Sequence, residues 1–276
     1  MITIVTDSTS YFKKSEAEEL NIKVAPNNYS IDGQNFDESF VDKNGDFESL
    51  LISSGASGAL STAHVNLSEF LNCFEEEVKN GNRVLCITLS SRFSGAYNTA
   101  NAAAKQVDDN NVFVFDSRLT AGGLYLLIKE AKSLIESGMD LNEIVEKELP
   151  KIRDRITIAF SVDDMTPLRN SGRLGFVRSS IGTFLNIKPI LLCKDGALVA
   201  DCTVRGDREV IKKLLFQLGK SPKKIVISYI GSNQLASDLY NIIKINHPAA
   251  ELSLQRVGPV LGIHLGFKMI SVSFIK

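Results

Sequence analysis

The first half of the chain alternates short apolar runs with longer runs in which apolar residues recur every three or four positions. The short runs predict strands at 2–6, 83–89 and 112–115. The longer runs predict amphipathic helices at 66–78, 96–107 and 122–137. Because parallel strands need a crossover of a dozen or more residues to connect them, this alternation predicts parallel β-α-β units and an α/β fold.

Hairpin signals interrupt this alternation in both halves. In the first half, Asp32-Gly33 predicts a hairpin over 29–36, and a second signal lies in the second half. Asp195-Gly196 supplies the positive φ angles of a tight turn between two apolar runs. Strands are predicted at 156–161, 188–193, 197–203, 225–229, 252–257 and 269–274. We therefore expect an N-terminal α/β domain over 1–160 with a mainly parallel sheet, and a C-terminal α/β domain over 161–276 with a mixed sheet. No Pro/Gly-rich linker separates them, so the two halves should pack closely.

Composition and charge exclude several classes of protein. With 44% hydrophobic and 23% charged residues, the chain is neither disordered nor fibrous. Its 31 basic and 32 acidic residues argue against a dedicated nucleic-acid binder. No apolar run approaches the ~18 residues that a transmembrane helix needs, and the first residues lack a basic leader. The four cysteines form no Cys-x-x-Cys pair, so we expect reduced thiols and a cytoplasmic protein.

Polar residues gather just beyond the predicted strands, where parallel sheets bind ligands. Thr6-Asp7-Ser8 follows the first strand, and Thr62-Ala63-His64 precedes an amphipathic helix. A serine-rich stretch that includes Ser91 follows the strand at 83–89, and Asp116-Ser117 follows the strand at 112–115. These hydroxyls and short acids are expected at one rim of the sheet.

Ser94-Gly95 stands where a predicted helix begins, so free backbone N–H groups and the positive end of the helix dipole converge there. A carboxylate or phosphate could be bound by these groups together with the Ser94 and Thr62 hydroxyls. The alternative is that Ser94 is an ordinary N-cap. His264 follows a glycine-punctuated segment, 257–263, that we predict to be a loop, and it could equally be a hydrogen-bonded structural histidine.

Motifs typical of enzymes are missing from the sequence. It contains no Gly-x-Gly-x-x-Gly, no phosphate-binding loop ending in Gly-Lys-Ser/Thr, no His-Glu-x-x-His and no Gly-x-Ser-x-Gly. Spaced clusters of metal ligands are absent as well. A nucleophilic pair of Ser94 and His264 is conceivable, but no orienting acid can be identified. The residues therefore indicate an anion-binding rim without an obvious reaction.

Five stretches stand in order along the chain, at 6–10, 62–70, 90–97, 170–190 and 258–266. Through them the chain resembles the DegV family, bacterial proteins that bind long-chain fatty acids. Some members of that family serve as the acyl-carrying subunit of a two-part fatty acid kinase. Two of the stretches depart from the usual family pattern. Residues 62–66 read Thr-Ala-His-Val-Asn in place of Thr-Ser-Gln-Pro-Ser, and 94–96 read Ser-Gly-Ala in place of Ser-Gly-Thr.

The resemblance implies a two-domain α/β protein with the lipid between or within the domains. The family's carboxylate-binding hydroxyls fall on Thr62 and Ser94, its C-terminal histidine falls on His264, and its Gly-Arg segment places Arg173 nearby. A partner- or phosphate-contacting arginine falls on Arg205. No metal and no cofactor beyond the fatty acid are implied, because nucleotide chemistry would belong to a separate kinase.

A fatty acid needs an apolar channel as well as a paired head group. Each buried CH₂ contributes ~0.8 kcal/mol, whereas an unpaired carboxylate in an apolar cavity is very costly. Candidate channel residues, each of which could instead be ordinary core, are Phe93, Leu119, Leu124, Leu127, Ile158, Phe160, Leu168, Phe184, Ile187 and Ile190. The leading hypothesis is a non-catalytic carrier that presents the acyl carboxylate to a kinase. The alternatives are a hydrolase or acyltransferase that uses Ser94 with His264, and a lipid-responsive regulatory protein.

Overall fold

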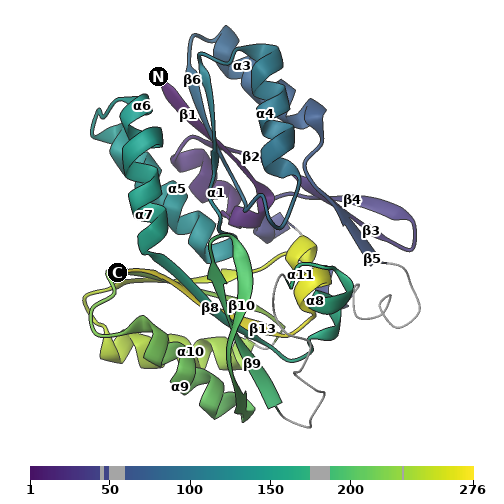
Figure 1. The fold of residues 1–276 in the computed structure, drawn as a ribbon, viewed down its shortest axis with the longest axis vertical. Helices are drawn as coiled ribbons and strands as arrows, with labels where there is room; N and C mark the ends of the chain where they lie inside the picture. Colours follow the sequence, from purple (N-terminus) through teal and green to yellow (C-terminus); the bar gives the residue numbers. More distant parts are fainter. Residues whose placement is uncertain (44–46, 50–59, 175–186, 232) are drawn as a thin grey trace.

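Three sheets make up the framework of the protein (Figure 1). The structure is a computed structural model that describes residues 1–43, 47–49, 60–174, 187–231 and 233–276. It confirms the predicted α/β class, with a parallel N-terminal sheet and a mixed C-terminal sheet. A small third sheet lies beside them; it contains the hairpin predicted over 29–36 and a further strand that we did not predict.

The N-terminal sheet has the strand order β2-β1-β6-β7, and all its pairs are parallel. Its strands are β1 (Ile2–Asp7), β2 (Ile22–Ala25), β6 (Arg83–Thr88) and β7 (Val112–Asp116). On one face, Val5 and Cys86 pack in a cluster with residues of α3 (Leu67–Lys79) and α4 (Ala96–Val107). On the other face, Ile4 and Leu85 pack with α5 (Ala121–Glu136).

The C-terminal sheet has the order β10-β9-β8-β13-β11-β12, and only its β11–β12 pair is parallel. Its strands are β8 (Ile156–Val162), β9 (Ile187–Lys194), β10 (Ala197–Arg205), β11 (Lys224–Ile230), β12 (Glu251–Arg256) and β13 (Met269–Ile275). The predicted hairpin forms between β9 and β10, where Asp195 and Gly196 have φ angles of 49° and 76°. Helices α9 (Gly206–Leu218) and α10 (Asn233–Asn246) cover one face.

Helix α5 joins the two large sheets into one packed body. A Cβ atom at Gly123 would lie 2.5 Å from Ile158 Cδ1, and one at Gly122 would lie 2.9 Å from Ser273 Oγ. The absence of side chains there lets the first turn of α5 rest directly on β8 and β13. The same helix packs against the N-terminal sheet, so the two halves share a core, as the missing linker led us to expect. The chain passes from one sheet to the other at β8.

The third sheet is antiparallel, with the order β4-β3-β5. It consists of β3 (Asn27–Ile31), β4 (Gln34–Glu38) and β5 (Leu60–Ala63). It packs through Tyr29 and Ile31 against Val260 of α11 (Pro259–Leu265). This helix corrects our prediction of a loop over 257–263. Pro259 begins it at a position that needs no backbone N–H, and Gly266, at φ 83°, ends it.

The remaining elements are short. They are η1 (Ser8–Ser10), α1 (Lys14–Glu19), η2 (Val41–Lys43), α6 (Leu141–Glu143), η3 (Ile144–Glu148), α7 (Leu149–Arg155) and α8 (Thr166–Asn170). Of these, η1 and α8 matter most for the site. The first places a polar turn directly after β1, and the second leads the chain into the segment that contains Arg173.

Candidate functional site

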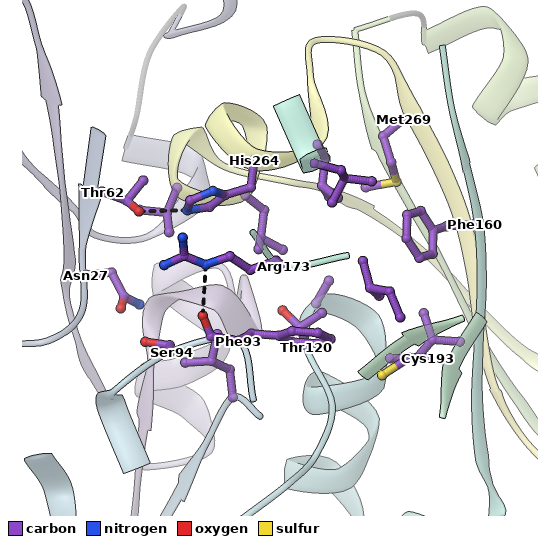
Figure 2. A pocket seen from close by; sticks show the side chains of 18 of the residues that line it. Asn27, Thr62, Phe93, Ser94, Thr120, Phe160, Arg173, Cys193, His264 and Met269 are labelled. Carbon is purple, nitrogen blue, oxygen red and sulfur yellow. Dashed lines mark hydrogen bonds between the residues drawn. The ribbon is translucent and has the colours of Figure 1, made fainter. Parts of the chain in front are cut away.

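A cavity lies where the three sheets, α4, α5 and α11 meet, and Figure 2 shows it from close by. Its empty space amounts to about 1010 Å³, the open space at its mouth included. Polar side chains gather at one end, and apolar side chains line the remainder. The cavity is therefore asymmetric along its length.

The polar end contains Thr62, Ser94, Gly95, Arg173 and His264, all of which we predicted as ligand-binding residues. They come from different elements. Thr62 lies on β5, Ser94 and Gly95 precede α4, His264 lies on α11, and Arg173 follows α8. Residues up to 202 positions apart in the chain thus face one another.

His264 is held by Thr62. The Thr62 Oγ1 atom lies 2.7 Å from His264 Nε2, while the buried Nδ1 has no hydrogen-bond partner among the described residues. Burial, with a smaller contribution from the positive charge of Arg173, lowers the pKa of His264 to about 4. The imidazole is therefore neutral at pH 7, and an anion placed beside it would oppose both effects.

Ser94 and Gly95 shape the start of α4. Gly95 is the N-cap residue of α4, and Ser94 lies one position before it. Ser94 Oγ accepts a hydrogen bond of 3.3 Å from the Ala96 amide. A Cβ atom at residue 95 would lie 3.1 Å from His64 Cε1, so Gly95 lets the His64 ring lie close against the helix start. His64 also lines the cavity. Ser94 is therefore not the N-cap that we gave as the alternative, and it lies at the polar end of the cavity.

Arg173 supplies a positive charge at the polar end. Its Nε atom donates a hydrogen bond of 3.4 Å to the Phe93 carbonyl, and an Nη1 atom donates to the Ser171 carbonyl. Figure 2 shows the guanidinium between His264 and Ser94. Both acceptors are backbone carbonyls, and no carboxylate among the described residues forms an ion pair with Arg173.

The apolar part of the cavity includes four of the predicted channel residues, namely Phe93, Ile158, Phe160 and Leu168. Four further residues that we did not predict complete much of its wall: Cys193, Leu198, Leu265 and Met269. Strands β8, β9, β10 and β13 contribute most of these side chains. The face of the C-terminal sheet opposite α9 and α10 thus forms the apolar wall.

Other predicted residues lie away from the cavity. Ser91 Oγ donates to Asp116 Oδ2 at 2.6 Å, and the Ser117 hydroxyl is hydrogen-bonded to the backbone of Leu119. Ile190 packs beneath α9, because its side chain points to the opposite face of β9 from Leu191. Arg205 is exposed at the end of β10.

Among the predicted channel residues, Leu119, Leu124 and Leu127 belong to the core shared around α5, and Ile187 does not line the cavity. Phe184 lies outside the described residues. Thr62 also differs from our expectation, because it belongs to the small antiparallel sheet and not to the rim of the parallel one. Because β5 pairs with β3 of the β3–β4 hairpin, Thr62 nevertheless lines the same cavity as Ser94.

A buried acidic network beside the polar end escaped the sequence analysis. Glu38 Oε1 accepts from the Val260 amide at 2.8 Å, and Glu38 Oε2 accepts from Ser8 Oγ at 2.6 Å. Burial raises the pKa of Glu38 to about 7. Asp7, whose pKa burial also raises, accepts from the Leu89 amide at 2.7 Å and from Thr9. The network ties β1, β4 and the start of α11 together.

Asn27 connects this network to the cavity. Its side-chain amide donates to Ser8 Oγ at 3.0 Å, and the residue lines the cavity near Thr62. Asp7 and Ser8 were visible in the sequence as a polar turn after the first strand, whereas no motif singled out Glu38 or Asn27. All four cysteines are free thiols, as expected.

The described part of the chain contains neither a metal-binding cluster nor a membrane-spanning helix. No group of three or more His, Cys, Asp or Glu side chains within it is placed to hold a metal ion. Likewise, none of the helices in the described part of the chain has the length and apolar character needed to cross a membrane.

Comparison with known proteins decides the family. A family model described as "Uncharacterised protein, DegV family" matches residues 1–276. The chain belongs to the DegV family. A DegV domain-containing protein of Halalkalibacterium halodurans is 30% identical over 279 residues, which covers 99% of this chain and 98% of the relative.

Solved structures of the DegV family have the same fold. The DegV protein of Bacillus subtilis, described as a fatty acid binding protein, is 25% identical with a TM-score of 0.88, over 100% of this chain and 99% of that one. A DegV family protein of Thermus thermophilus, whose structure is described as showing fatty acid binding, is 25% identical with a TM-score of 0.87 and the same coverage. A Thermotoga maritima DegV lipid binding protein, 24% identical over 99% of this chain and 98% of that one, has a TM-score of 0.89.

Proposed function

We propose that this DegV family protein binds a long-chain fatty acid with its carboxylate at the polar end of the cavity and its acyl chain along the apolar wall. The observation that carries the proposal is the asymmetry of the cavity, with Thr62, Ser94, Arg173 and His264 at one end and apolar side chains beyond them. The fatty acid binding described for the Bacillus subtilis and Thermus thermophilus relatives supports it.

The polar end suits a single carboxylate. The hydroxyls of Thr62 and Ser94 can donate to its oxygens, and Arg173 supplies the opposite charge. Hydrogen bonds to a charged group contribute about 1.5–3 kcal/mol each, although not additively. A carboxylate beside His264 would favour the protonated imidazole, which then becomes a further donor. These groups orient the ligand by its head.

The acyl chain would supply most of the affinity. At ~0.8 kcal/mol for each buried CH₂, the tail of a long-chain acid outweighs two or three head-group hydrogen bonds. Phe93, Phe160 and Met269 give the cavity the apolar wall that such a tail needs. The acyl chain thus supplies most of the binding free energy, and the carboxylate determines the orientation of the ligand.

We further propose that the protein is a carrier that presents the carboxylate to a separate kinase, and that Arg205, exposed at the end of β10, contacts that partner or the transferred phosphate. The hydrogen bonding of the polar end supports a carrier over an acyl-transferring enzyme. His264 Nε2 is engaged by Thr62, and Ser94 Oγ faces the Ala96 amide. A nucleophilic serine would need His264 as its base and an acid to orient the imidazole.

The direct test is extraction of lipid from the purified protein followed by mass spectrometry, with titration of delipidated protein by oleate and palmitate. We expect one fatty acid per chain. Protein that neither carries nor takes up a fatty acid would overturn the proposal. Incubation with an activated acyl ester separates carrier from enzyme, because turnover that disappears in Ser94→Ala would identify a hydrolase or acyltransferase.

The head-group assignment is tested with the double variant Thr62→Val/Ser94→Ala. We expect its affinity for palmitate to fall at least about tenfold, since about 1.4 kcal/mol corresponds to a factor of ten and two donors are lost. Ser61→Ala is the matched control, because Ser61 lies on the same strand but does not line the cavity. An unchanged affinity in the double variant would place the carboxylate elsewhere.

A further inference from the structure

The apolar wall of the cavity contains a hydroxyl group that the head-group chemistry does not use. Thr120 lines the cavity just before α5. Its Oγ1 atom is buried and has no hydrogen-bond partner within the described part of the chain. The side chain does not cap its own helix either. A buried hydroxyl without a partner is costly, so its position facing a ligand cavity calls for an explanation.

A second hydroxyl lies on the same stretch of wall. Ser271, only 3% exposed, lines the cavity from β13 and donates its hydrogen to the Ser228 carbonyl at 3.3 Å. Its oxygen therefore keeps acceptor capacity. Ser271 and Ser273 share one face of β13, and Gly122 at the start of α5 sits directly against Ser273. This packing brings the start of α5, and hence Thr120, to the part of β13 that holds Ser271.

The position of Thr120 along the cavity indicates which part of a ligand it would meet. In Figure 2, Thr120 lies beside Phe93, between the polar end marked by Ser94 and the apolar region marked by Phe160 and Met269. A chain whose carboxylate occupies the polar end would pass Thr120 with its early carbons. An unsubstituted chain would leave the Thr120 hydroxyl unpaired at that point.

We propose that the cavity is selective for fatty acids that carry a hydroxyl group near the carboxyl end, and that Thr120 is the residue that determines this selectivity. The inference rests on the proposed function and adds the class of acyl chain. A 3-hydroxyl group can accept a hydrogen bond from Thr120 Oγ1 and donate its one hydrogen to Ser271 Oγ. A site with a buried hydrogen-bonding group discriminates against a ligand that leaves that group unpaired.

The test measures dissociation constants for palmitate, 3-hydroxypalmitate and 16-hydroxypalmitate by competition against a fluorescent fatty acid. The wild-type protein should bind 3-hydroxypalmitate about 2- to 10-fold more tightly than palmitate, the range that one net hydrogen bond provides. The 16-hydroxyl compound, which places its hydroxyl against the apolar wall, should bind more weakly than palmitate.

Thr120→Val keeps the shape of the side chain and removes the hydroxyl, so it should reverse the preference. Palmitate should bind more tightly to it than to the wild type, and 3-hydroxypalmitate more weakly. Ser271→Ala should also reduce the preference for 3-hydroxypalmitate over palmitate. Thr88→Val is the matched control, because Thr88 also has a buried hydroxyl without a partner among the described residues, yet does not line the cavity. Its preference should equal that of the wild type.

Two outcomes distinguish a failure of this selectivity from a failure of fatty acid binding itself. If palmitate binds and 3-hydroxypalmitate binds no more tightly, or if the preference survives in Thr120→Val, the selectivity is refuted while fatty acid binding stands. If none of the three acids binds to the wild-type protein, fatty acid binding itself is refuted.

Discussion

The buried carboxyl group of Glu38 gives the protein a pH-dependent stability that can be worked out from the structure. Glu38 is fully buried, and burial raises its pKa from 4.5 to about 7, which its hydrogen bonds from Ser8 and Val260 only partly offset. The native state therefore holds this proton more tightly than the unfolded state does. Stability from this group is fully present below pH 4.5 and is lost as the pH rises through about 7.

The size of the effect follows from the shift. At 1.36 kcal/mol per pKa unit, the whole window corresponds to about 3 kcal/mol, most of which falls between pH 5 and pH 8. Glu38→Gln removes the titration. Both carboxyl oxygens accept hydrogen bonds, from Ser8 Oγ and the Val260 amide, so the amide should also lose one of these bonds. That cost does not vary with pH.

Urea unfolding of the wild type and of Glu38→Gln at pH 5, 6, 7 and 8 isolates the contribution. The free energy of unfolding of the variant relative to the wild type should rise by about 2–3 kcal/mol from pH 5 to pH 8. Asp7 is present in both proteins, so its own titration largely cancels. Glu19→Gln, at the exposed end of α1, is the control and should run parallel to the wild type. Parallel curves for Glu38→Gln and the wild type would refute the reasoning.

Three further predictions concern the site and its support. The pKa of His264 in the ligand-free protein should be about 4, and oleate should raise it by at least about one unit because a carboxylate stabilises the imidazolium. NMR titration of the imidazole measures both pKa values, and an unchanged pKa would show that the carboxylate does not bind beside His264. Leu198→Trp should shorten the apolar channel, so palmitate should lose more affinity than decanoate in a competition assay, and an equal loss for both acids would contradict the channel. Gly123→Ala should lower the free energy of unfolding by about 1–3 kcal/mol, because its Cβ would meet Ile158. Ser133→Ala, on the exposed side of α5, should not lower it, and equal stability of the two variants would refute the close packing.

The sequence was most informative where local chemistry and the fold agree. Apolar periodicity predicted α4 over the same residues that the structure shows, and the Asp-Gly pair at 195–196 predicted the β9–β10 hairpin. It failed where contacts distant in sequence decide the structure. Strand β5 has only four residues, and it pairs with β3, about 30 positions earlier. Such a short segment shows no clear periodicity of apolar residues.

Helix α11 was missed for a different reason. Its seven residues contain Pro259 and Gly262, and Gly258 precedes them, a composition that predicts a loop. The Glu38 carboxylate accepting from the Val260 amide compensates for this at the start of the helix. A Cβ atom at residue 258 would lie 2.5 Å from Glu38 Oε1, so the glycine that looked like a loop signal permits this contact.

For the site, Thr62 and Ser94, which both their place in the sequence and the family resemblance indicated, lie together with Arg173 and His264 at the polar end. Ser91 and Ser117, selected from their place after a strand, and Arg205, implied by the resemblance, do not line the cavity. Ser91 and Ser117 follow strands as Ser94 does, but each has a local partner, Asp116 or the Leu119 backbone. The prediction for Ile190 was wrong because successive side chains of a strand face opposite sides of the sheet. A shift of one position along the strand therefore moves a side chain from the cavity side of the sheet to the side that packs against α9. Sequence shows which groups are available but not which are already satisfied.

The spread of the polar end over four elements has a consequence for how a bound carboxylate would act. Thr62, Ser94, Arg173 and His264 are supplied by β5, the start of α4, the segment after α8, and α11. The groups that hold these elements in place without ligand include Glu38 and neutral His264, both of which burial pushes towards their uncharged forms. An anion bound there would favour the charged imidazole and bridge these four elements. Ligand binding would therefore stabilise the protein as a whole, by an amount that grows as the logarithm of ligand concentration, and not only the loops that touch the head group.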